Sequence, residues 1–259
     1  MTRRDEYYNR SKQEGYRSRA SYKLKQIDEE AGLFAPGDRV VDLGAAPGGW
    51  LQVAAEAVGE TGTVVGVDLQ RIDDFEDLAD HDVVTLRGDM TQKRTRHYLR
   101  KAVGEDGADV VVSDMAPNMT GEYSLDHARS VHLARQAFDV AEELLGPGGD
   151  FVVKVFQGED LEDFRRDVES TFEYVRTMSP PASRDSSSEV YLVGKGFLTA
   201  PVSAGDRVDV EIEGVGEEGD GIAYLDGYTL FVPDTTVGES VTVVVEELKP
   251  RFGFAKRVE

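Results

Sequence analysis

A lysine stands inside an apolar stretch of the chain, the sequence FVVKVF at residues 151–156. Lysine is almost never buried without a partner, so Lys154 in a central strand would indicate chemistry, whereas in an edge strand its amine could reach solvent. Burial and a second nearby cation favour the neutral amine, which can accept a proton as a general base. A second candidate, Asp114, follows the valine run VVVS and should lie at the end of the preceding strand.

The sequence VVDLGAAPGGWLQ at residues 40–52 has the pattern of a buried strand, a turn of small residues and a helix start. Small residues let the backbone approach a ligand closely, and a helix start offers unpaired N–H groups. The motif is not G-x-G-x-x-G and Pro47 removes one N–H, which disfavours a dinucleotide pyrophosphate and an NAD-dependent oxidoreductase. The alternative is an ordinary strand–helix turn, which the run of small residues at 44–49 disfavours.

Three strands are predicted to end in an acid beside this loop: Asp42, Asp68 and Asp89. An acid at the position of Asp68 can accept hydrogen bonds from both hydroxyls of a bound ribose. An acid at the position of Asp89 can receive the exocyclic amine of adenine. Each acid alone could cap the next helix. The three together favour an adenosyl ligand.

Short β-rich runs alternate with helical patterns from about residue 39 to 194. This pattern predicts a doubly wound α/β fold, a mostly parallel seven-stranded sheet with helices on both faces. Such sheets bind ligands at the carboxyl ends of their strands. The predicted strands are 40–43, 63–68, 83–87, 109–113, 150–155, 174–178 and 190–193, and the predicted helices are 18–30, 50–57, 91–102, 126–145 and 161–171.

The pattern changes near Pro201, beyond which no long helix can be drawn. Short strands separated by glycine-rich turns predict a small β-barrel. We therefore expect two domains, residues 1–199 and residues 200–259. The predicted strands of the second domain are 207–212, 221–225, 228–233, 240–248 and 252–258.

The chain is strongly acidic, with a formal net charge of −21, and its acids are spread along its length. It has 9 Lys against 20 Arg, which together with the acidity suggests adaptation to a salt-rich cytoplasm. At molar salt the Debye length is about 3 Å, so the net charge does not exclude a polyanionic partner. The chain has no cysteine, no apolar run of membrane-spanning length and a charged start, MTRRDEYYNR, so we expect a cytoplasmic protein without a thiolate site.

Residues 1–25 differ from the rest because they carry 8 Lys and Arg against 3 Asp and Glu, a balance of +5. Such a basic run can be a helix face exposed to solvent or a contact for phosphates, and the run alone favours neither explanation. Aromatic rings interleaved with cations are suited to RNA. The tyrosines are Tyr7, Tyr8, Tyr16 and Tyr22, and the cations among them are Arg10, Arg17, Arg19 and Lys23.

Taken together, these motifs resemble the FtsJ-type (RrmJ-type) ribosomal RNA 2′-O-ribose methyltransferases. They occur in the family's order and cover about residues 8–197. The resembling segments are RSRASYKLKQID, VVDLGAAPGGWLQ, GVDLQ, GDMT, SDMAPNMTG, VVKVFQGE and SRDSSSEVYLVGKGF.

The resemblance implies a Lys–Asp–Lys–Glu catalytic tetrad at Lys23, Asp114, Lys154 and Glu189. It also implies binding of S-adenosylmethionine, with S-adenosylhomocysteine as the product and no metal. In this scheme Lys154 removes a proton from the ribose 2′-hydroxyl, Asp114 orients it, Lys23 holds the RNA, and Glu189 fixes the lysines. The cofactor contacts implied are Gly48, Trp50, Asp68, Asp89 and Asp114.

The C-terminal part resembles a TRAM domain, a small β-barrel found on RNA-modifying enzymes. Its end, KPRFGFAKR at 249–257, places Phe252 and Phe254 among Lys249, Arg251, Lys256 and Arg257. Such residues suit a structured RNA, although the two rings could equally be core residues of a hairpin.

The substrate implied is a uridine in the A-loop of 23S ribosomal RNA, in the large ribosomal subunit, methylated by a monomeric enzyme. A transfer RNA is an alternative target, because a related branch of the family methylates anticodon loops. A non-catalytic ribosome-assembly factor that only binds RNA is another alternative. The complete tetrad disfavours it, since a binding protein has no need of a lysine in an apolar strand.

Overall fold

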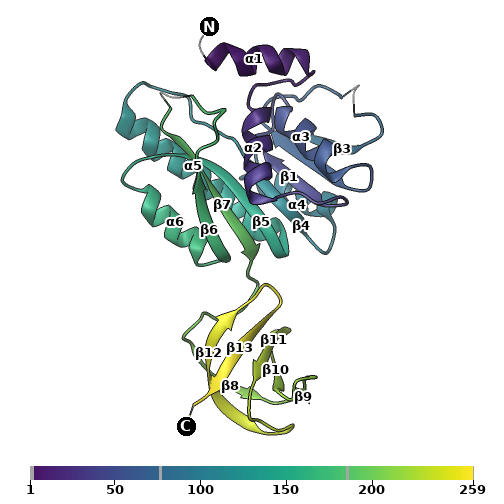
Figure 1. The fold of residues 1–259 in the computed structure, drawn as a ribbon, viewed down its shortest axis with the longest axis vertical. Coiled ribbons are helices and arrows are strands. Elements are labelled where there is room, and N and C mark those ends of the chain that lie inside the picture. Colours follow the sequence, from purple (N-terminus) through teal and green to yellow (C-terminus); the bar gives the residue numbers. More distant parts are fainter. Residues whose placement is uncertain (1–2, 76–77, 185–186, 259) are drawn as a thin grey trace.

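The computed structural model describes residues 3–75, 78–184 and 187–258, so residues 1 and 2 of the basic N-terminal segment lie outside it. The chain forms two β-sheets, of which the first is flanked by helices and the second is not (Figure 1). The helices are α1 (Arg3–Gln13), α2 (Ser21–Ala31), α3 (Gly49–Val58), α4 (Lys93–Val103), α5 (Tyr123–Leu144) and α6 (Leu161–Glu169).

The first sheet has seven strands in the order β3-β2-β1-β4-β5-β7-β6. Its pairs are parallel except for those of β7, which runs antiparallel to β5 and to β6. This confirms the predicted doubly wound α/β fold. The strands are β1 (Arg39–Leu43), β2 (Thr63–Asp68), β3 (Asp82–Arg87), β4 (Ala108–Ser113), β5 (Leu145–Phe156), β6 (Phe172–Met178) and β7 (Glu189–Phe197).

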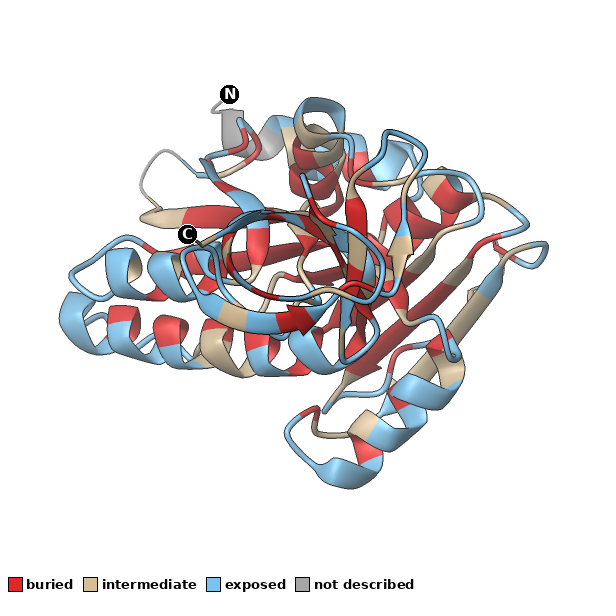
Figure 2. Cartoon of the chain, turned by 90° about the horizontal axis from the view of Figure 1, so that it is seen from below, coloured by how far each residue is buried: buried red, intermediate tan, exposed pale blue. Residues whose placement is uncertain are grey.

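Successive side chains of a strand point to opposite faces of the sheet, and the valine-rich strands therefore supply two separate cores. Val41 and Leu43 pack with α4, α5 and α6, whereas Val40 packs with α2 and α3. The strands of the first sheet are largely buried, whereas its helices expose one side to solvent (Figure 2). The catalytic candidates lie on the face covered by α2 and α3.

The second sheet has six strands in the order β8-β12-β13-β11-β10-β9. It is curled around a core of its own and forms a half-barrel. Its strands are β8 (Arg207–Glu211), β9 (Gly214–Val215), β10 (Gly221–Leu225), β11 (Tyr228–Val232), β12 (Ser240–Leu248) and β13 (Phe252–Arg257).

The two sheets meet at the end of the first sheet where β5 begins and β7 ends (Figure 1). The contacts there include a hydrogen bond of 2.8 Å from the Thr199 hydroxyl to the Pro250 carbonyl and an ion pair of 3.4 Å between Lys249 and Glu173. The carboxyl ends of the parallel strands lie at the opposite end. The second sheet therefore attaches far from the edge where ligands are expected.

Candidate active site

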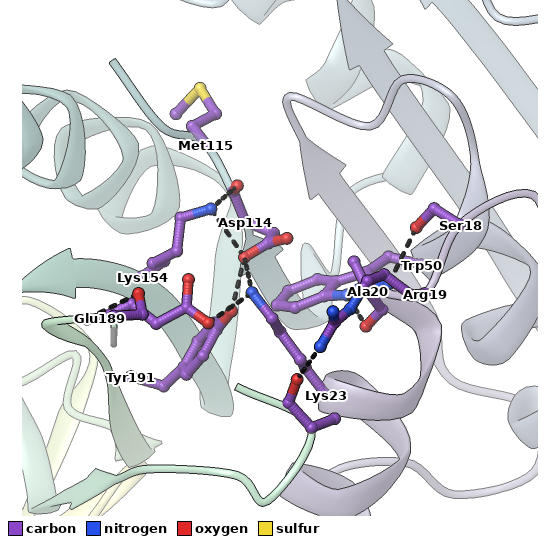
Figure 3. A network of polar contacts seen from close by, with 12 residues as sticks. Ser18, Arg19, Ala20, Lys23, Trp50, Asp114, Met115, Lys154, Glu189 and Tyr191 are labelled. Atoms are coloured by element: carbon purple, nitrogen blue, oxygen red, sulfur yellow. Dashed lines mark hydrogen bonds and ion pairs between the residues drawn. The ribbon is translucent and has the colours of Figure 1, made fainter. Parts of the chain in front are cut away.

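Lys154 of β5 and Asp114, which directly follows β4, meet at the carboxyl ends of their strands (Figure 3). The Lys154 ammonium lies 2.9 Å from Oδ1 of Asp114 and also donates to the Asp114 carbonyl. The Lys154 side chain is only 7% exposed, so Asp114 is the partner that a buried lysine requires.

The two other candidate residues complete a compact cluster of charges. Lys23 of α2 forms an ion pair of 2.7 Å with Glu189, the first residue of β7. The Lys23 ammonium also lies 3.9 Å from Oδ1 of Asp114. The structure therefore brings together all four residues that the resemblance implied, with two cations balancing two carboxylates.

Tyr191 belongs to the same cluster, although the sequence analysis did not single it out. Its hydroxyl donates a hydrogen bond of 2.6 Å to Oδ1 of Asp114. Lys154 and Tyr191 are directly paired between β5 and β7, so their side chains lie side by side on one face. The spacing in EVY could have identified it, because Tyr191 follows Glu189 by two positions and must share its face.

The surroundings of Asp114 determine its protonation. Burial opposes the charged form, but Lys154, then Lys23, and the hydrogen bond from Tyr191 outweigh burial and hold the pKa of Asp114 below its usual value. For Tyr191, burial and then the charges of Asp114 and Glu189 raise the pKa well above its usual value. Asp114 is therefore a carboxylate that accepts from a neutral phenol.

A cavity of about 570 Å³ opens on one side of Asp114. Asp68, Asp89 and Asp114 line it together with the apolar side chains of Leu69 and Met90. The hydroxyl and then the backbone N–H of Thr91 bond to Asp89 and lower its pKa, which favours the carboxylate. Acceptors for hydroxyls and an amine beside apolar surface fit an adenosyl group.

The small-residue loop borders this cavity closely. Gly44 has φ +79°, and a Cβ there would lie 2.1 Å from the Met115 side chain, so only glycine fits. The next residues are held by β2, since the N–H of Ala46 donates to Asp68 at 3.0 Å. The loop thus forms one wall of the cavity.

Gly48 and Trp50 lie at the start of α3 and are not among the residues that line the cavity. Phe75 and Arg17 cover Gly48: a Cβ at Gly48, which has φ +107°, would lie 2.7 Å from the Phe75 ring. The Trp50 indole is buried and donates to the Ala20 carbonyl at 2.8 Å. Its side chain therefore joins α3 to the segment that carries Lys23.

Asp42 is a correction to the strand-end interpretation. It lies within β1, is 1% exposed and does not line the cavity. Burial, followed by the charges of Asp114 and Asp68, raises its pKa well above the usual value, and its Oδ2 has no hydrogen-bond partner among the described residues. Asp42 shares the face of Val40, because side chains alternate along the strand.

This burial predicts a pH dependence that Asp42→Asn should remove. A carboxyl whose pKa is raised by folding stabilises the protein below about pH 4, and that contribution is lost as pH rises toward the folded pKa. As pH rises above about 4, we expect the free energy of unfolding of Asp42→Asn to increase relative to that of the parent, by up to about 1.4 kcal/mol per pH unit. Urea denaturation across this range measures it, and parallel curves would contradict the buried acid.

A second cavity, of about 360 Å³, lies on the other side of the charge cluster. Lys154, Lys23 and Glu189 line it, together with Phe156 and Ala116. Arg19 and Arg184 add two further cations to its walls. Asp114 lines the first cavity, which is lined by carboxylates, and Lys154 lines the second, which is lined mainly by cations, so the ion pair of the two residues lies between the cavities.

The basic N-terminal segment is only partly available to a ligand. Tyr16 and Tyr22 are buried in the core beneath α2, so these two rings cannot stack on a nucleic acid. Arg17 donates to the carbonyls of Asp73 and Asp74 at 2.6 Å each, which ties the segment to the loop after β2. Tyr8 is 53% exposed and remains accessible.

The profile of FtsJ-like methyltransferases matches residues 16–197, which contain the whole cluster and both cavities. The chain belongs to the FtsJ-like methyltransferase family. This confirms the resemblance drawn from the motifs. The TRAM domain profile matches residues 201–258, the segment of the second sheet.

Two relatives of this FtsJ-like chain span nearly its full length. One from Halorubrum lacusprofundi is 76% identical over all of this chain and 95% of its own. One from Haloquadratum walsbyi is 64% identical over the whole of both chains. Both are named ribosomal RNA large subunit methyltransferase E. Their halophilic sources agree with the salt adaptation predicted from composition.

A solved structure supports the fold of the FtsJ-like part. The crystal structure of a protein described as a ribosomal RNA methyltransferase from Plasmodium falciparum is 25% identical and superposes with a TM-score of 0.62. It covers 70% of this chain and 98% of its own. No helix in the described part of the FtsJ-like chain is long and apolar enough to cross a membrane.

Proposed function

We propose that this chain methylates the ribose 2′-hydroxyl of a uridine in the A-loop of 23S ribosomal RNA, with S-adenosylmethionine as donor and S-adenosylhomocysteine as product. The observation that carries the proposal is the placement of the Lys154 amine against Asp114, between the two cavities. The family membership and the relatives' names support the reaction type and the class of RNA.

Lys154 is the proposed general base. A ribose hydroxyl is a weak acid, and its attack on a methyl group requires an in-line approach and the removal of one proton. S-adenosylmethionine supplies a methyl group activated by a positively charged sulfur. After losing its own proton to solvent, the neutral Lys154 amine, held by both the carboxylate and the carbonyl of Asp114, receives the hydroxyl proton, and Asp114 stabilises the ammonium that results.

Lys23 and Glu189 have supporting roles in this proposal. Lys23 points its ammonium into the cation-lined cavity while paired with Glu189, so it can hold the ribose or its phosphate. Glu189 keeps Lys23 near Asp114 and thereby fixes the distance between the two lysines. Tyr191 locks the Asp114 carboxylate in place through its hydrogen bond.

The carboxylate-lined cavity is the proposed seat of the adenosyl group. Asp68 would accept from the ribose hydroxyls and Asp89 from the adenine amine, with Asp114 beside the reacting end. Trp50 would contribute through its backbone N–H in the first turn of α3, where N–H groups have no helical partner. The Gly48 N–H already donates to the Ala45 carbonyl at 2.7 Å, so Gly48 would contribute through the close approach that its missing side chain allows. We propose no metal in this site, because each step is assigned to a side chain.

The C-terminal sheet is the proposed RNA-binding domain, and we place the boundary of the two domains between residues 199 and 200. Phe252 and Phe254 are 37% and 36% exposed, so they are not core residues of a hairpin. With Phe231 they form a cluster of three rings whose centroids are 5.6–5.9 Å apart. Exposed rings on the outer face of a sheet suit stacking with bases.

The double substitution Phe252→Ala/Phe254→Ala should weaken RNA binding by roughly 5- to 150-fold for each base that loses a stacking partner. Cofactor affinity should not change, because the rings lie on the other sheet. Filter binding to a large-subunit RNA fragment and calorimetry with S-adenosylmethionine measure the two affinities. Val237→Ala, at another exposed apolar residue of this domain, is the control. Unaltered RNA affinity would rule out the stacking role.

We propose that the enzyme acts as a monomer in the cytoplasm on the large ribosomal subunit or its precursor. Mass-spectrometric mapping of 2′-O-methylation in ribosomal and transfer RNA, from strains with and without the gene, tests the substrate. Loss of one A-loop methyl group supports the proposal. Loss of a transfer RNA methyl group would show that transfer RNA is the substrate. Loss of no methyl group would favour an assembly factor.

A further inference from the structure

Helix α4 has a basic surface that the proposed catalytic residues do not use. Its 11 residues contain no Asp or Glu, in a chain whose net charge is −21. Glu143 of α5 pairs with Arg96 and Arg100. Neither Lys93 nor Lys101 forms an ion pair within the described part of the chain. The basic residues of the helix are Lys93, Arg94, Arg96, Arg100 and Lys101.

The basic surface begins at the cofactor edge of the first sheet, the edge at the carboxyl ends of the parallel strands beside the carboxylate-lined cavity. Lys93 follows Asp89 and Met90, which line the carboxylate-lined cavity. The helix then runs back along the sheet for about 16 Å, since each helical residue adds about 1.5 Å. Lys93, Arg94, Arg100 and Lys101 are all exposed along this length.

The surface ends near the second sheet. Arg100 and Lys101 line a third cavity, of about 560 Å³, whose lining also includes Gly146, Pro147 and the acids Glu105, Asp106 and Glu143. The next residue, Gly148, lies against Pro250: a Cβ built on Gly148 would be 3.6 Å from the Pro250 side chain. Pro250 belongs to the segment KPRFGFAKR, so the basic surface of α4 leads from the cofactor edge toward the exposed aromatic cluster.

An aromatic ring lies within this surface. Tyr98 is 45% exposed, and the Arg94 guanidinium lies 5.6 Å from the centre of its ring. Cations with an exposed ring match a phosphate backbone and an unstacked base, whereas an acidic protein would use the cations alone. This combination favours RNA over an acidic polypeptide.

We propose that the exposed face of α4, formed by Lys93, Arg94, Tyr98, Arg100 and Lys101, binds the RNA backbone between the carboxyl-end edge of the first sheet, where both proposed binding cavities lie, and the C-terminal sheet. The inference rests on the proposed function, since it takes the bound RNA to be the substrate. It explains how one RNA can reach two sites at opposite ends of the first sheet: the phosphates between them follow a cationic surface on an otherwise acidic molecule.

The test compares the full-length protein with Lys93→Gln/Arg94→Gln/Lys101→Gln. The control, Arg135→Gln/Arg165→Gln/Arg166→Gln, removes the same charge from cations that are already paired with carboxylates. The affinity for a large-subunit RNA fragment is measured over a series of KCl concentrations. Each lost phosphate contact lowers the slope of log affinity against log salt by about 0.7 to 0.9, so we expect a loss of about 2 to 3 for the α4 variant and none for the control.

The proposal would be overturned if the α4 variant and the control had the same slope, whether that slope equals the parent's or is lower in both variants. Cofactor affinity and thermal midpoint should match the parent, because all three side chains are exposed. The charge reversal Lys93→Glu/Lys101→Glu should weaken binding further, and binding no weaker than that of the glutamine variant would also contradict the inference. Methylation by the parent protein reports on the proposed function separately: a parent that binds RNA with the expected slope but methylates none would refute the function and not the surface.

Discussion

Replacing Lys154 with alanine is expected to lower the rate of methyl transfer by roughly 10²- to 10⁴-fold, the range that a general base contributes. The affinity for S-adenosylmethionine should stay within a few-fold of the parent, because Lys154 does not line the carboxylate-lined cavity. Single-turnover methylation of a large-subunit RNA fragment, together with calorimetry for the cofactor, separates the two effects.

Lys195→Ala is the matched control for this variant. Lys195 also lies on the central strands and pairs with a carboxylate, Asp150, but at the other end of β5 and β7. The control therefore removes a similar ion pair without altering the charge cluster. Transfer at the parent rate by Lys154→Ala, or an equal loss in both variants, would refute the role of Lys154 as base.

Asp114→Asn should reduce methyl transfer to a similar degree and should also destabilise the protein. Asparagine keeps the shape of the side chain but leaves the buried Lys154 ammonium without its counter-charge. Removing one member of a buried ion pair costs about 3 to 5 kcal/mol. Urea denaturation at neutral pH measures the loss.

The double variant Asp114→Asn/Lys154→Met distinguishes charge from packing. It removes both charges, so most of the stability lost in the single variant should return while methyl transfer stays as low as in the single variants. A double variant no more stable than Asp114→Asn would mean that the ion pair is not what stabilises this edge of the sheet.

The first sheet was predictable because its signals are local. Runs such as VVDL and FVVKVF define buried strands, and six of the seven predicted strands begin within two residues of those observed. For β5 the observed strand begins at Leu145, five residues before the predicted start, because Leu145 and Asp150, at the two ends of the turn-like segment LGPGGD, both pair with β4 across a shift in register. Helix α1 was not predicted because few of its residues are apolar. Strand β9 escaped prediction because it has only two residues.

The charge cluster was predictable as a set of residues and not as a geometry. The motifs identified Lys23, Asp114, Lys154 and Glu189, but the closeness of Lys23 to Glu189 depends on how α2 packs across β7. The spacing in EVY places Tyr191 on the face of Glu189, but its position beside Lys154 depends on the pairing register of β5 with β7, which the sequence does not specify. Asp42 shows the reverse, since a strand-end acid proved to face the core.

The exposure of the C-terminal rings could not be read from the pattern RFGFAKR alone. Phe252 and Phe254 are two positions apart in β13 and therefore lie on one face of the strand. Which face of the strand is covered depends on how the sheet curls. Gly253 and Ala255 face the core of the half-barrel, so small residues fill the inside and the phenylalanines lie outside.

The proposed reaction places a methyl group on a ribose oxygen, and the position of the transferred group can be measured directly. The purified protein is incubated with isotope-labelled S-adenosylmethionine and large ribosomal subunits from a strain that lacks the gene, and the RNA is digested to nucleosides for mass spectrometry. We expect one labelled 2′-O-methyluridine per particle, and at least 100-fold less label at early times when Lys154→Ala replaces the parent, a drop of roughly the size that a general base contributes. Label on a base, or no label in the RNA, would contradict it.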